Sequence, residues 1–418
     1  MRMFILTDEI QRPIMKLHNK ILSAAAMTLM SHSVTAVPFT FEGRSLGMGG
    51  VAVATADLAT AAWANPAMLT NQRPDDHFSL LIGAGAYLRD NNDLVTDVEN
   101  FQSADDRRVA AQDAGDVVGE AQAIFDMSST VRNLEGKVIA PEASILAAMG
   151  MSTDFLSYAI SIRADAIAGG IVTDTSCQVL VDPGCDLAEA ERQLTSTDYN
   201  ILTIEGVLAT EFGFSIAGDF QLLDRKFSIG IKPKLVDLQS FSYRESILTA
   251  SAGFDNITKE DTTQDLGTLT TADLGLAYDI SESFRLGLNV RNLISDEFKI
   301  QEQTLNFDTE ARLGAAYHSN FMTIGVDYDL TENKPLLSNP DFTGLKTQYL
   351  LLGAEFNAFD YAQLRVGARK NLASGISDLA KDTAYTAGIG FWLGFNLDIA
   401  ENFTDNSIGG FLHKGFRF

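Results

Sequence analysis

The two cysteines of the chain, Cys177 and Cys185, are the residues whose chemistry is easiest to predict from the sequence. They enclose the segment QVLVDPG, in which Pro183 and Gly184 can form a turn. Cysteines this close form disulfides in exported proteins, and the N-terminus described below marks this chain for export. A metal site would need further ligands, and no histidine lies nearby in the sequence. We therefore predict a disulfide between the two cysteines and no metal site.

The other reactive residue types form no catalytic pattern. GMGG at 47–50 lacks the Lys and Ser/Thr that complete a phosphate-binding loop, and no predicted strand precedes it. Beyond the N-terminal segment the histidines are His77, His318 and His413, which are scattered and match neither a triad nor a zinc spacing. We therefore expect no catalytic residues, no cofactor and no enzyme.

Arginines recur at alternate positions in strand-like segments. The segment SFRLGLNVRN places Arg285 and Arg291 on one face, opposite an apolar face. Arginines on this polar face are Arg163, Arg285, Arg291, Arg312, Arg365 and Arg369. Acidic side chains share the face, so ion pairs between strands would stiffen a narrow interior. Alternatively, a few arginines would meet an anionic head group that passes through the interior.

The same alternation dominates the chain from Phe78 onward and predicts an all-β protein. We expect about fourteen strands, near residues 77–89, 139–151, 154–166, 201–216, 225–238, 271–280, 283–294, 308–318, 321–330, 347–357, 361–370, 383–392, 394–402 and 411–418. Long and short connections alternate throughout, so every long loop lies at the same end. A soluble sandwich has no reason for this arrangement, whereas an antiparallel transmembrane β-barrel does. Strands of about ten residues are also long enough to span a bilayer when tilted.

One stretch departs from the strand pattern. Residues 105–133 carry apolar side chains at helical spacing, including Val117, Ile124 and Phe125. This stretch falls in the first long connection. We therefore expect a small helical segment in an outer loop, which serves as a cap or, alternatively, as a ligand groove.

The N-terminus has the composition of a secretory signal peptide. From Met15, the basic residues Lys16 and Lys20 precede a short apolar stretch, and Val34-Thr35-Ala36 fits a cleavage site. Residues 1–14 are acidic in part, so Met15 is the expected translation start. No apolar run of eighteen residues follows, which argues against a helical membrane protein. The predicted organisation is a signal peptide at 1–36, a plug or hatch segment at 37–76 and a barrel at 77–418.

Bulk charge limits the partners. The formal net charge is −24, which argues against nucleic acid as a partner because its phosphates would repel the chain. The partners expected for a barrel are outer-membrane lipid and a hydrophobic small-molecule ligand.

The segment from Gly43 to Leu69 consists mostly of small residues. Gly47, Gly49 and Gly50 would allow tight turns and close backbone approach. Pro66 disfavours a helical Asn65, so the Asn65-Pro66-Ala67 sequence should end any preceding helix. The segment could fill the lumen of the barrel as a plug, or it could pack under the barrel as a helical lead-in.

The chain ends with GFLHKGFRF, in which Phe416 and Phe418 share a face. This pattern resembles the C-terminal aromatic signal that the barrel-assembly machinery recognises. A plain terminal strand is the alternative interpretation.

The segment GMGGVAVATADLATAAWANPAML resembles the N-terminal signature of the FadL-type long-chain fatty acid transporter superfamily. The chain is more similar still to a related family of exported barrels labelled conjugal transfer protein TraF, which the phrases LGLNVRNLI, VDYDLTEN, LRVGARKNL and YTAGIGFWLG also resemble. This resemblance implies a fourteen-stranded outer-membrane barrel with its plug at Gly43–Leu69. It also implies FadL-like transport of hydrophobic or amphipathic small molecules. The alternative that it implies is a non-catalytic envelope component that binds conjugation or secretion proteins.

Overall fold

The computed structural model describes most of the chain beyond residue 42. The described residues are 43–58, 60–71, 78–90, 93–134, 137–153, 155–173, 175–179, 181–249, 263–300, 303–334, 337–338, 346–359, 362–374, 383–392, 396–402 and 407–417. The predicted signal peptide therefore lies outside them. No helix within these ranges is long and apolar enough to cross a membrane.

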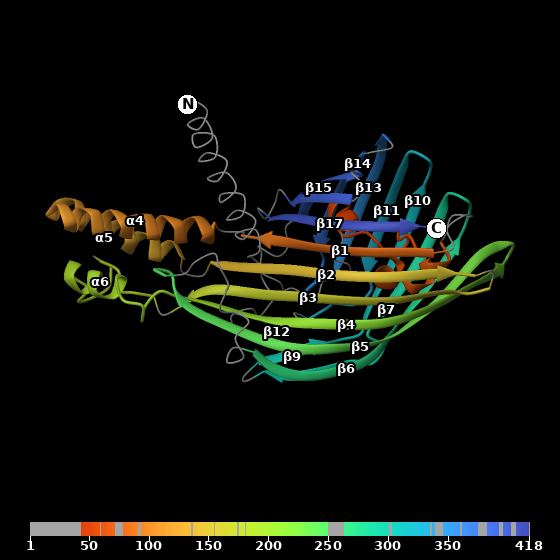
Figure 1. The fold of residues 1–418 in the computed structure, drawn as a ribbon, viewed down its shortest axis with the longest axis horizontal. Coiled ribbons are helices and arrows are strands. Elements are labelled where there is room, and N and C mark those ends of the chain that lie inside the picture. Colours follow the sequence, from red (N-terminus) through yellow and green to blue (C-terminus); the bar gives the residue numbers. More distant parts are fainter. Residues whose placement is uncertain are drawn as a thin grey trace, which may run out of the picture.

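Fourteen strands of the described residues close into an antiparallel barrel, as the sequence predicts (Figure 1). Neighbours in the chain are neighbours in the wall, and β1 pairs with β17 to close it. The barrel strands are β1 Phe78–Arg89, β2 Val138–Ser152, β3 Ser157–Thr173, β4 Ile201–Leu222, β5 Arg225–Ser246, β6 Thr263–Asp279, β7 Phe284–Arg291, β10 Glu310–His318, β11 Met322–Asp329, β13 Tyr349–Phe359, β14 Ala362–Asn371, β15 Thr383–Trp392, β16 Asn396–Asn402 and β17 Ser407–Arg417. Long and short connections alternate, which defines a short-turn end and a long-loop end.

The outward face of the barrel carries an apolar band, typical of a wall that contacts lipid. Ile160 is 42% exposed, whereas the adjacent Ser161 is buried in the interior. Exposed apolar side chains of this band include Ile82, Ile145, Ile162, Phe212, Phe214, Ile229, Leu286, Val326, Val366, Ile399 and Leu412. The predicted register therefore assigns inward and outward faces correctly.

Arginine at Val366 should impair barrel assembly more than arginine at Gln363 on the same strand. Val366 is 51% exposed on the outward face, and an arginine near the bilayer midplane costs about 2–4 kcal/mol. Gln363 instead lines a wide part of the lumen, where a long polar side chain has room. Urea unfolding of both variants in lipid bilayers measures the difference. A larger loss for the Gln363 variant would mean that the two faces are exchanged, as a one-residue slip would do, and equal losses would contradict the assignment of Val366 to the lipid face.

Strands β3, β5 and β6 extend further at the long-loop end than the sequence predicts. β4 begins at residue 201, as predicted, and extends instead at the short-turn end, to Leu222. Beyond the lipid-facing Phe212, β4 continues into a region where outward Leu202 and Ile204 and inward Val207 are all buried. The alternation of exposed and buried residues that marks a half-buried strand is therefore lost there. The predicted end of β5, at residue 238, therefore lies before its observed end at Ser246.

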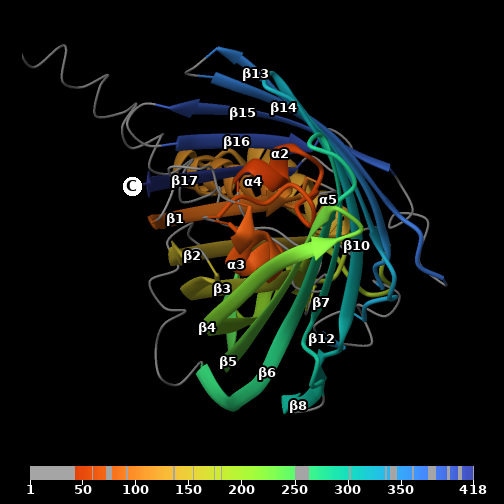
Figure 2. The same ribbon diagram turned by 90° about the vertical axis from the view of Figure 1, so that its right-hand side faces the viewer.

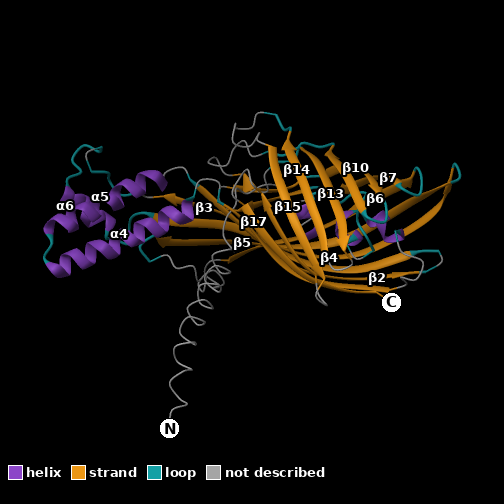
Figure 3. Cartoon of the chain, turned by 90° about the horizontal axis from the view of Figure 1, so that it is seen from above, coloured by secondary structure: helices purple, strands orange, loops and turns teal. Residues whose placement is uncertain are grey.

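Three helices lie at the long-loop end and project beyond the ends of the strands: α4 Leu94–Ala114, α5 Val117–Leu134 and α6 Leu187–Leu194 (Figures 1 and 3). The single helix predicted at 105–133 is in fact the α4–α5 hairpin, which is broken at Gly115, where φ is 67°. Their shared core includes Phe101, Met127, Ile204 and Tyr243. The helices therefore pack against outward side chains near the long-loop ends of the strands.

The start of α4 is capped by a side chain from the preceding loop. The Asp90 carboxylate accepts hydrogen bonds from the Leu94 and Val95 backbone amides, at 2.7 and 3.1 Å. Burial raises the pKa of Asp90, because the charged form loses hydration.

A second, three-stranded sheet lies at the long-loop end (Figure 1). It contains β8 Asp296–Ile300, β9 Gln303–Phe307 and β12 Leu337–Ser338, in the order β12-β9-β8. The sequence predicts loops in these regions. The sequence analysis assigned strands only to the barrel wall, so it did not consider a separate hairpin. The apolar residues Phe298, Leu305 and Phe307 were the available signal.

The N-terminal described residues, 43–71, lie inside the barrel and are called the plug segment below. The segment contains α2 Gly43–Gly47, α3 Ala61–Ala64 and the 3₁₀ helix η1 Pro66–Thr70. Figure 2 looks from the short-turn end and shows α2 and α3 enclosed by strands. Plug side chains and wall side chains, such as Leu81 and Leu146, form one buried apolar cluster.

Candidate functional site: the barrel lumen

Asn65 fixes the path of the plug segment. The helix α3 ends at this residue, whose backbone is extended, and Pro66 then begins η1. The Asn65 side chain accepts a hydrogen bond from the Ala67 amide at 3.1 Å and donates to the Val53 and Leu276 carbonyls at 3.0 and 3.1 Å. One buried side chain thus joins two parts of the plug segment to strand β6.

Other wall side chains bond directly to the plug backbone. The Asp327 carboxylate accepts from the Ala52 and Val53 amides, at 2.8 and 3.0 Å. The Asn289 amide donates to the Ala64 carbonyl at 2.7 Å. Buried backbone groups that belong to no helix or sheet need such partners, so these bonds stabilise an irregular chain in the lumen.

Glycines of the wall make room for the plug segment. Eight consecutive strands of the wall, β5 to β15 in barrel order, each place a glycine where an added Cβ would lie within 3.0 Å of a plug atom. We call this set the glycine belt; it contains Gly230, Gly275, Gly287, Gly314, Gly325, Gly353, Gly367 and Gly388. The plug segment follows the belt from strand to strand, from Gly47 beside Gly388 to Pro66 beside Gly230.

The glycine belt is the feature that sequence analysis missed. The signal was present, because Gly287, Gly325 and Gly367 each interrupt the inward face of a predicted strand. A glycine inside a strand often marks a close backbone approach. One such glycine in strand after strand indicates a continuous surface for a second segment.

The plug glycines lie against this belt. Gly49 and Gly50 have φ values of 71° and 99°, which favour glycine. A Cβ on Gly49 would lie 2.9 Å from both the Leu352 carbonyl oxygen and the Ala368 amide nitrogen. Gly47 packs against Gly388, and its carbonyl accepts from the Thr386 hydroxyl at 3.2 Å.

The short-turn side of the plug segment faces an open cavity of about 870 Å³. Arg44 of the plug donates to both oxygens of Glu355, at 2.9 and 3.0 Å. Glu355 also accepts from Arg365 at 2.8 Å, and Arg365 pairs with Asp398. A chain of ion pairs thus connects the plug to strands β13, β14 and β16.

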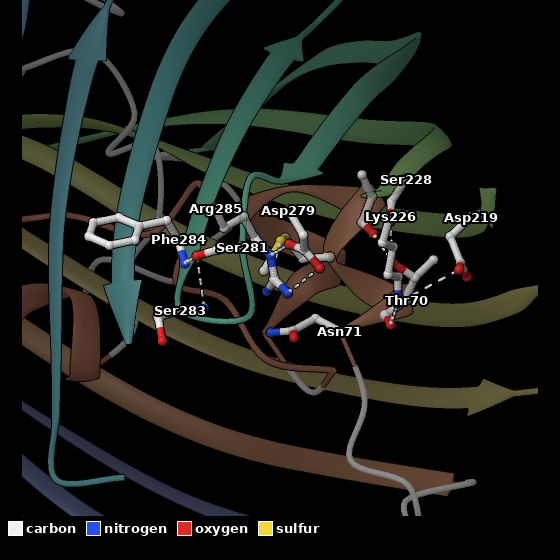
Figure 4. A network of polar contacts seen from close by, with 12 residues as sticks. Thr70, Asn71, Asp219, Lys226, Ser228, Asp279, Ser281, Ser283, Phe284 and Arg285 are labelled. Atoms are coloured by element: carbon white, nitrogen blue, oxygen red, sulfur yellow. Dashed lines mark hydrogen bonds and ion pairs between the residues drawn. The ribbon is translucent and has the colours of Figure 1, made fainter. Parts of the chain in front are cut away.

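The last turn of the plug segment is held at the same end (Figure 4). The Lys226 ammonium donates to the Thr70 carbonyl at 2.6 Å, and the Thr70 hydroxyl donates to Ser228 at 2.7 Å. Nearby, Arg285 pairs with Asp279 of the neighbouring strand. These contacts come from β5, β6 and β7, opposite the contacts of Arg44.

A second charged layer lies on the long-loop side of the plug segment. Lys234 bridges Glu211 and Asp273, at 3.1 and 2.9 Å. The other ion pairs in this layer are Arg163–Asp165, Lys232–Glu211, Arg291–Glu310 and Arg312–Asp329. Part of this layer, including Arg163, Glu211 and Arg291, lines a small cavity of about 40 Å³. Charges of both signs are paired here, so the lumen is packed rather than open.

The six arginines predicted on the inward faces therefore divide into groups. Arg163, Arg291 and Arg312 belong to the layer on the long-loop side, and Arg285 and Arg365 to the cavity at the short-turn end. The remaining one, Arg369, lies over the ring of Tyr349 at 5.8 Å. Sequence alternation predicts the face of each residue but not its depth.

Cys177 and Cys185 form a disulfide in the loop before α6, with their Cα atoms 5.9 Å apart. Both side chains pack against the apolar core of α4 to α6. No group of three or more His, Cys, Asp or Glu residues in the described chain could hold a metal ion. Of the C-terminal pair, Phe416 is opposite Leu80 in the β1–β17 ladder, and Phe418 lies outside the described residues.

Replacing Cys177 and Cys185 with serine should loosen only this loop. Closing so short a loop restricts the unfolded chain by about 2–3 kcal/mol, and the wall strands make no use of it. Limited proteolysis should cleave the variant between the two positions faster than the unchanged protein. Heat-modifiable gel mobility, which reports the barrel, should stay the same. A lost barrel band would contradict this assignment.

These features define a membrane-spanning β-barrel of fourteen strands whose lumen is filled by its own N-terminal segment. Residues 62–329 match the family model described as "F plasmid transfer operon, TraF, protein", and the chain belongs to this family. Comparison with curated protein sequences found no match.

Solved structures with a similar fold include channels and transporters for hydrocarbons. The P. putida toluene transporter TodX matches with a TM-score of 0.51 and 12% identity, over 91% of this chain and 99% of that chain. A TodX deltaS2S3 mutant described as a monoaromatic hydrocarbon channel matches with a TM-score of 0.51 and 11% identity, over 90% and 99%. The CymD monoaromatic hydrocarbon channel matches with a TM-score of 0.50 and 12% identity, over 91% and 98%. At these identities the likeness concerns the fold.

Proposed function

We propose that the protein lies in the outer membrane and lets hydrophobic or amphipathic small molecules pass through its lumen when the plug segment moves. The observation that carries this proposal is the glycine belt, since eight strands give up side-chain packing to hold a separate segment in the lumen. A barrel with a purely structural role could fill its lumen with wall side chains instead. The apolar outward band supports contact with membrane lipid.

The fold likeness supports the class of cargo. TodX and CymD are described as a toluene transporter and a monoaromatic hydrocarbon channel. Those descriptions and the absence of a catalytic pattern in the sequence also favour a channel over an enzyme. The arginines next to the cavity at the short-turn end offer one means of meeting an anionic head group, although their ion pairs with Glu355, Asp279 and Asp398 equally serve to hold the plug.

Uptake measurements test this proposal. Purified protein in liposomes should admit a labelled aromatic hydrocarbon or fatty acid faster than empty liposomes, and a deletion strain should lose the corresponding uptake. A protein whose plug segment is cross-linked to the wall is the matched control and should admit neither. Unchanged uptake in the deletion strain, together with inactive liposomes, would reject the transport function.

A second candidate is a non-catalytic envelope component of a conjugal transfer or secretion apparatus. Membership of a family described by a transfer operon favours it. Under this alternative, the deletion strain should lose mating or secretion efficiency and keep its uptake. Conjugation or secretion proteins would then be partners, and the barrel-assembly machinery would insert the barrel in either case.

The orientation follows from the loop lengths and is tested separately. We propose that the short turns face the periplasm, as in other barrels of this kind. The disulfide loop would then face the exterior, and Pro183 within it is exposed. An epitope inserted at Pro183 should be detected on intact cells. Detection only after permeabilisation of the outer membrane would reverse the orientation.

A further inference from the structure

The β8–β9 hairpin covers part of the lumen from the long-loop end. Its strand β9 points Leu305 and Phe307 into the barrel, where they are 0% and 7% exposed. They pack on inward side chains of the wall, among them Val207, Val236 and Leu238. The wall thus offers an apolar layer that these two side chains occupy.

The covalent connections of the hairpin to the wall lie at its base, where it joins β7 and β10. Its two ends meet where the Thr309 hydroxyl donates to the Asn292 carbonyl at 2.7 Å. Next to this point the Leu293 amide donates to the Ala272 carbonyl at 2.9 Å. Beyond the base, β9 pairs with β8 and β12 and with no strand of the barrel. Moving the hairpin would leave the ladder of the wall intact, but it would carry β12 along or break the two residue pairs that join β9 to β12.

The covered region lies next to the second charged layer, on its long-loop side. Asn306 and Phe307 line the same small cavity as Arg163, Glu211 and Lys234. Successive inward residues of β5 show the order along the barrel axis: Gly230 contacts the plug, Lys232 and Lys234 form ion pairs, and Val236 and Leu238 contact the hairpin. A molecule entering along β3 to β6 would meet the hairpin before the plug segment.

We propose that the β8–β9 hairpin is a lid whose Leu305 and Phe307 occupy the apolar layer of the lumen in the closed state. An apolar molecule that enters by this route must displace these two side chains. The role of the lid in transport rests on the proposed function. Whether the lid is closed can be measured on the folded protein alone. The lid and the plug segment then close the same route at two depths.

Thiol labelling tests closure without any transport assay. The two natural cysteines are joined to each other, so a single introduced cysteine is the only free thiol of the chain. Val236→Cys, under the lid, should react slowly with a membrane-impermeant maleimide in purified, folded protein. Ile294→Cys, at a position that is 60% exposed on the lid base, gives the rate of an uncovered thiol.

Combining Val236→Cys with Leu305→Ser and Phe307→Ser should raise its labelling rate at least about tenfold, because losing the burial of even one large apolar side chain shifts an opening equilibrium by that much. Leu305→Ala alone should give a smaller rise, and it remains informative if the combined variant does not fold. An unchanged rate in the folded variants would reject the lid, as would a Val236→Cys rate equal to that of Ile294→Cys. Loss of uptake in the proposed assay would bear on the transport function and leave this result unaffected.

Discussion

Replacing Gly367 with valine should drive the plug segment from its position while the barrel still forms. A Cβ at Gly367 would lie 2.2 Å from the Gly49 amide nitrogen and 2.4 Å from the Met48 carbonyl carbon. Both are backbone atoms, so no side chain can rotate away. Overpacking typically costs about 1–3 kcal/mol, and each 1.4 kcal/mol changes an equilibrium tenfold, so the displaced state should gain about 10- to 100-fold in population. Ion conductance in planar bilayers should rise accordingly.

The control is the same substitution at Gly410 on the wall. An added Cβ at Gly410 has no neighbour within 4 Å, so valine there should leave the conductance unchanged. Valine also suits strands better than glycine, so the backbone itself should not resist either change. If Gly367→Val folds and conducts no better than Gly410→Val, then the glycine belt does not decide the position of the plug segment.

Alternation along the chain was sufficient to predict the barrel wall. In β7, Leu286 and Leu288 point outward while Arg285 and Arg291 point inward, and lipid on one side with a polar lumen on the other maintains this contrast. The contrast disappears where the outward face is covered by protein. Tyr243 of β5 is buried under the helices, so the extension of β5 carries no periodic signal that marks its end.

The helices differ in whether they could be predicted from neighbouring residues alone. α6 could have been predicted, because Asp186 and Glu189 have the spacing of a helix N-cap, and the Asp186 carboxylate accepts from the Glu189 amide at 2.9 Å. The packing of α4 and α5 on the wall could not, because it depends on how far strands such as β3 and β5 extend at the long-loop end. The same holds for the arginines, whose depth in the lumen depends on the stagger of neighbouring strands.

The plug segment combines both kinds of information. Asn65-Pro66-Ala67 ends a helix by local rules, and in the structure Asn65 does so with an extended backbone. Whether such a segment fills a lumen depends on the glycines of strands that lie hundreds of residues away. The sequence therefore left the plug and the lead-in open as alternatives, and the structure brings residues 43–71 into the barrel.

Deleting residues 43–69 should convert the closed barrel into one that conducts ions. The deletion removes the Ala52 and Val53 amides, which donate to the Asp327 carboxylate. It also removes the Ala64 carbonyl, which accepts from the Asn289 side chain. It also leaves Glu355 without Arg44. If these wall groups stayed buried without partners, each would cost about 1–3 kcal/mol. Water that enters the lumen removes this cost. A hydrated lumen is the state that satisfies them.

The wall should survive this deletion, because its ladder contains no plug residue. β1 begins only at Phe78, and every strand of the wall pairs with two others of the wall. Heat-modifiable gel mobility should therefore be retained while single-channel conductance rises well above that of the intact protein. The rise should be larger still when Leu305→Ser and Phe307→Ser are added, since the lid closes the same route further out. A folded but non-conducting deletion variant would mean that the charged layer and the lid suffice to close the lumen. A variant that does not fold would mean that the apolar cluster shared with Leu81 and Leu146 is needed to form the barrel.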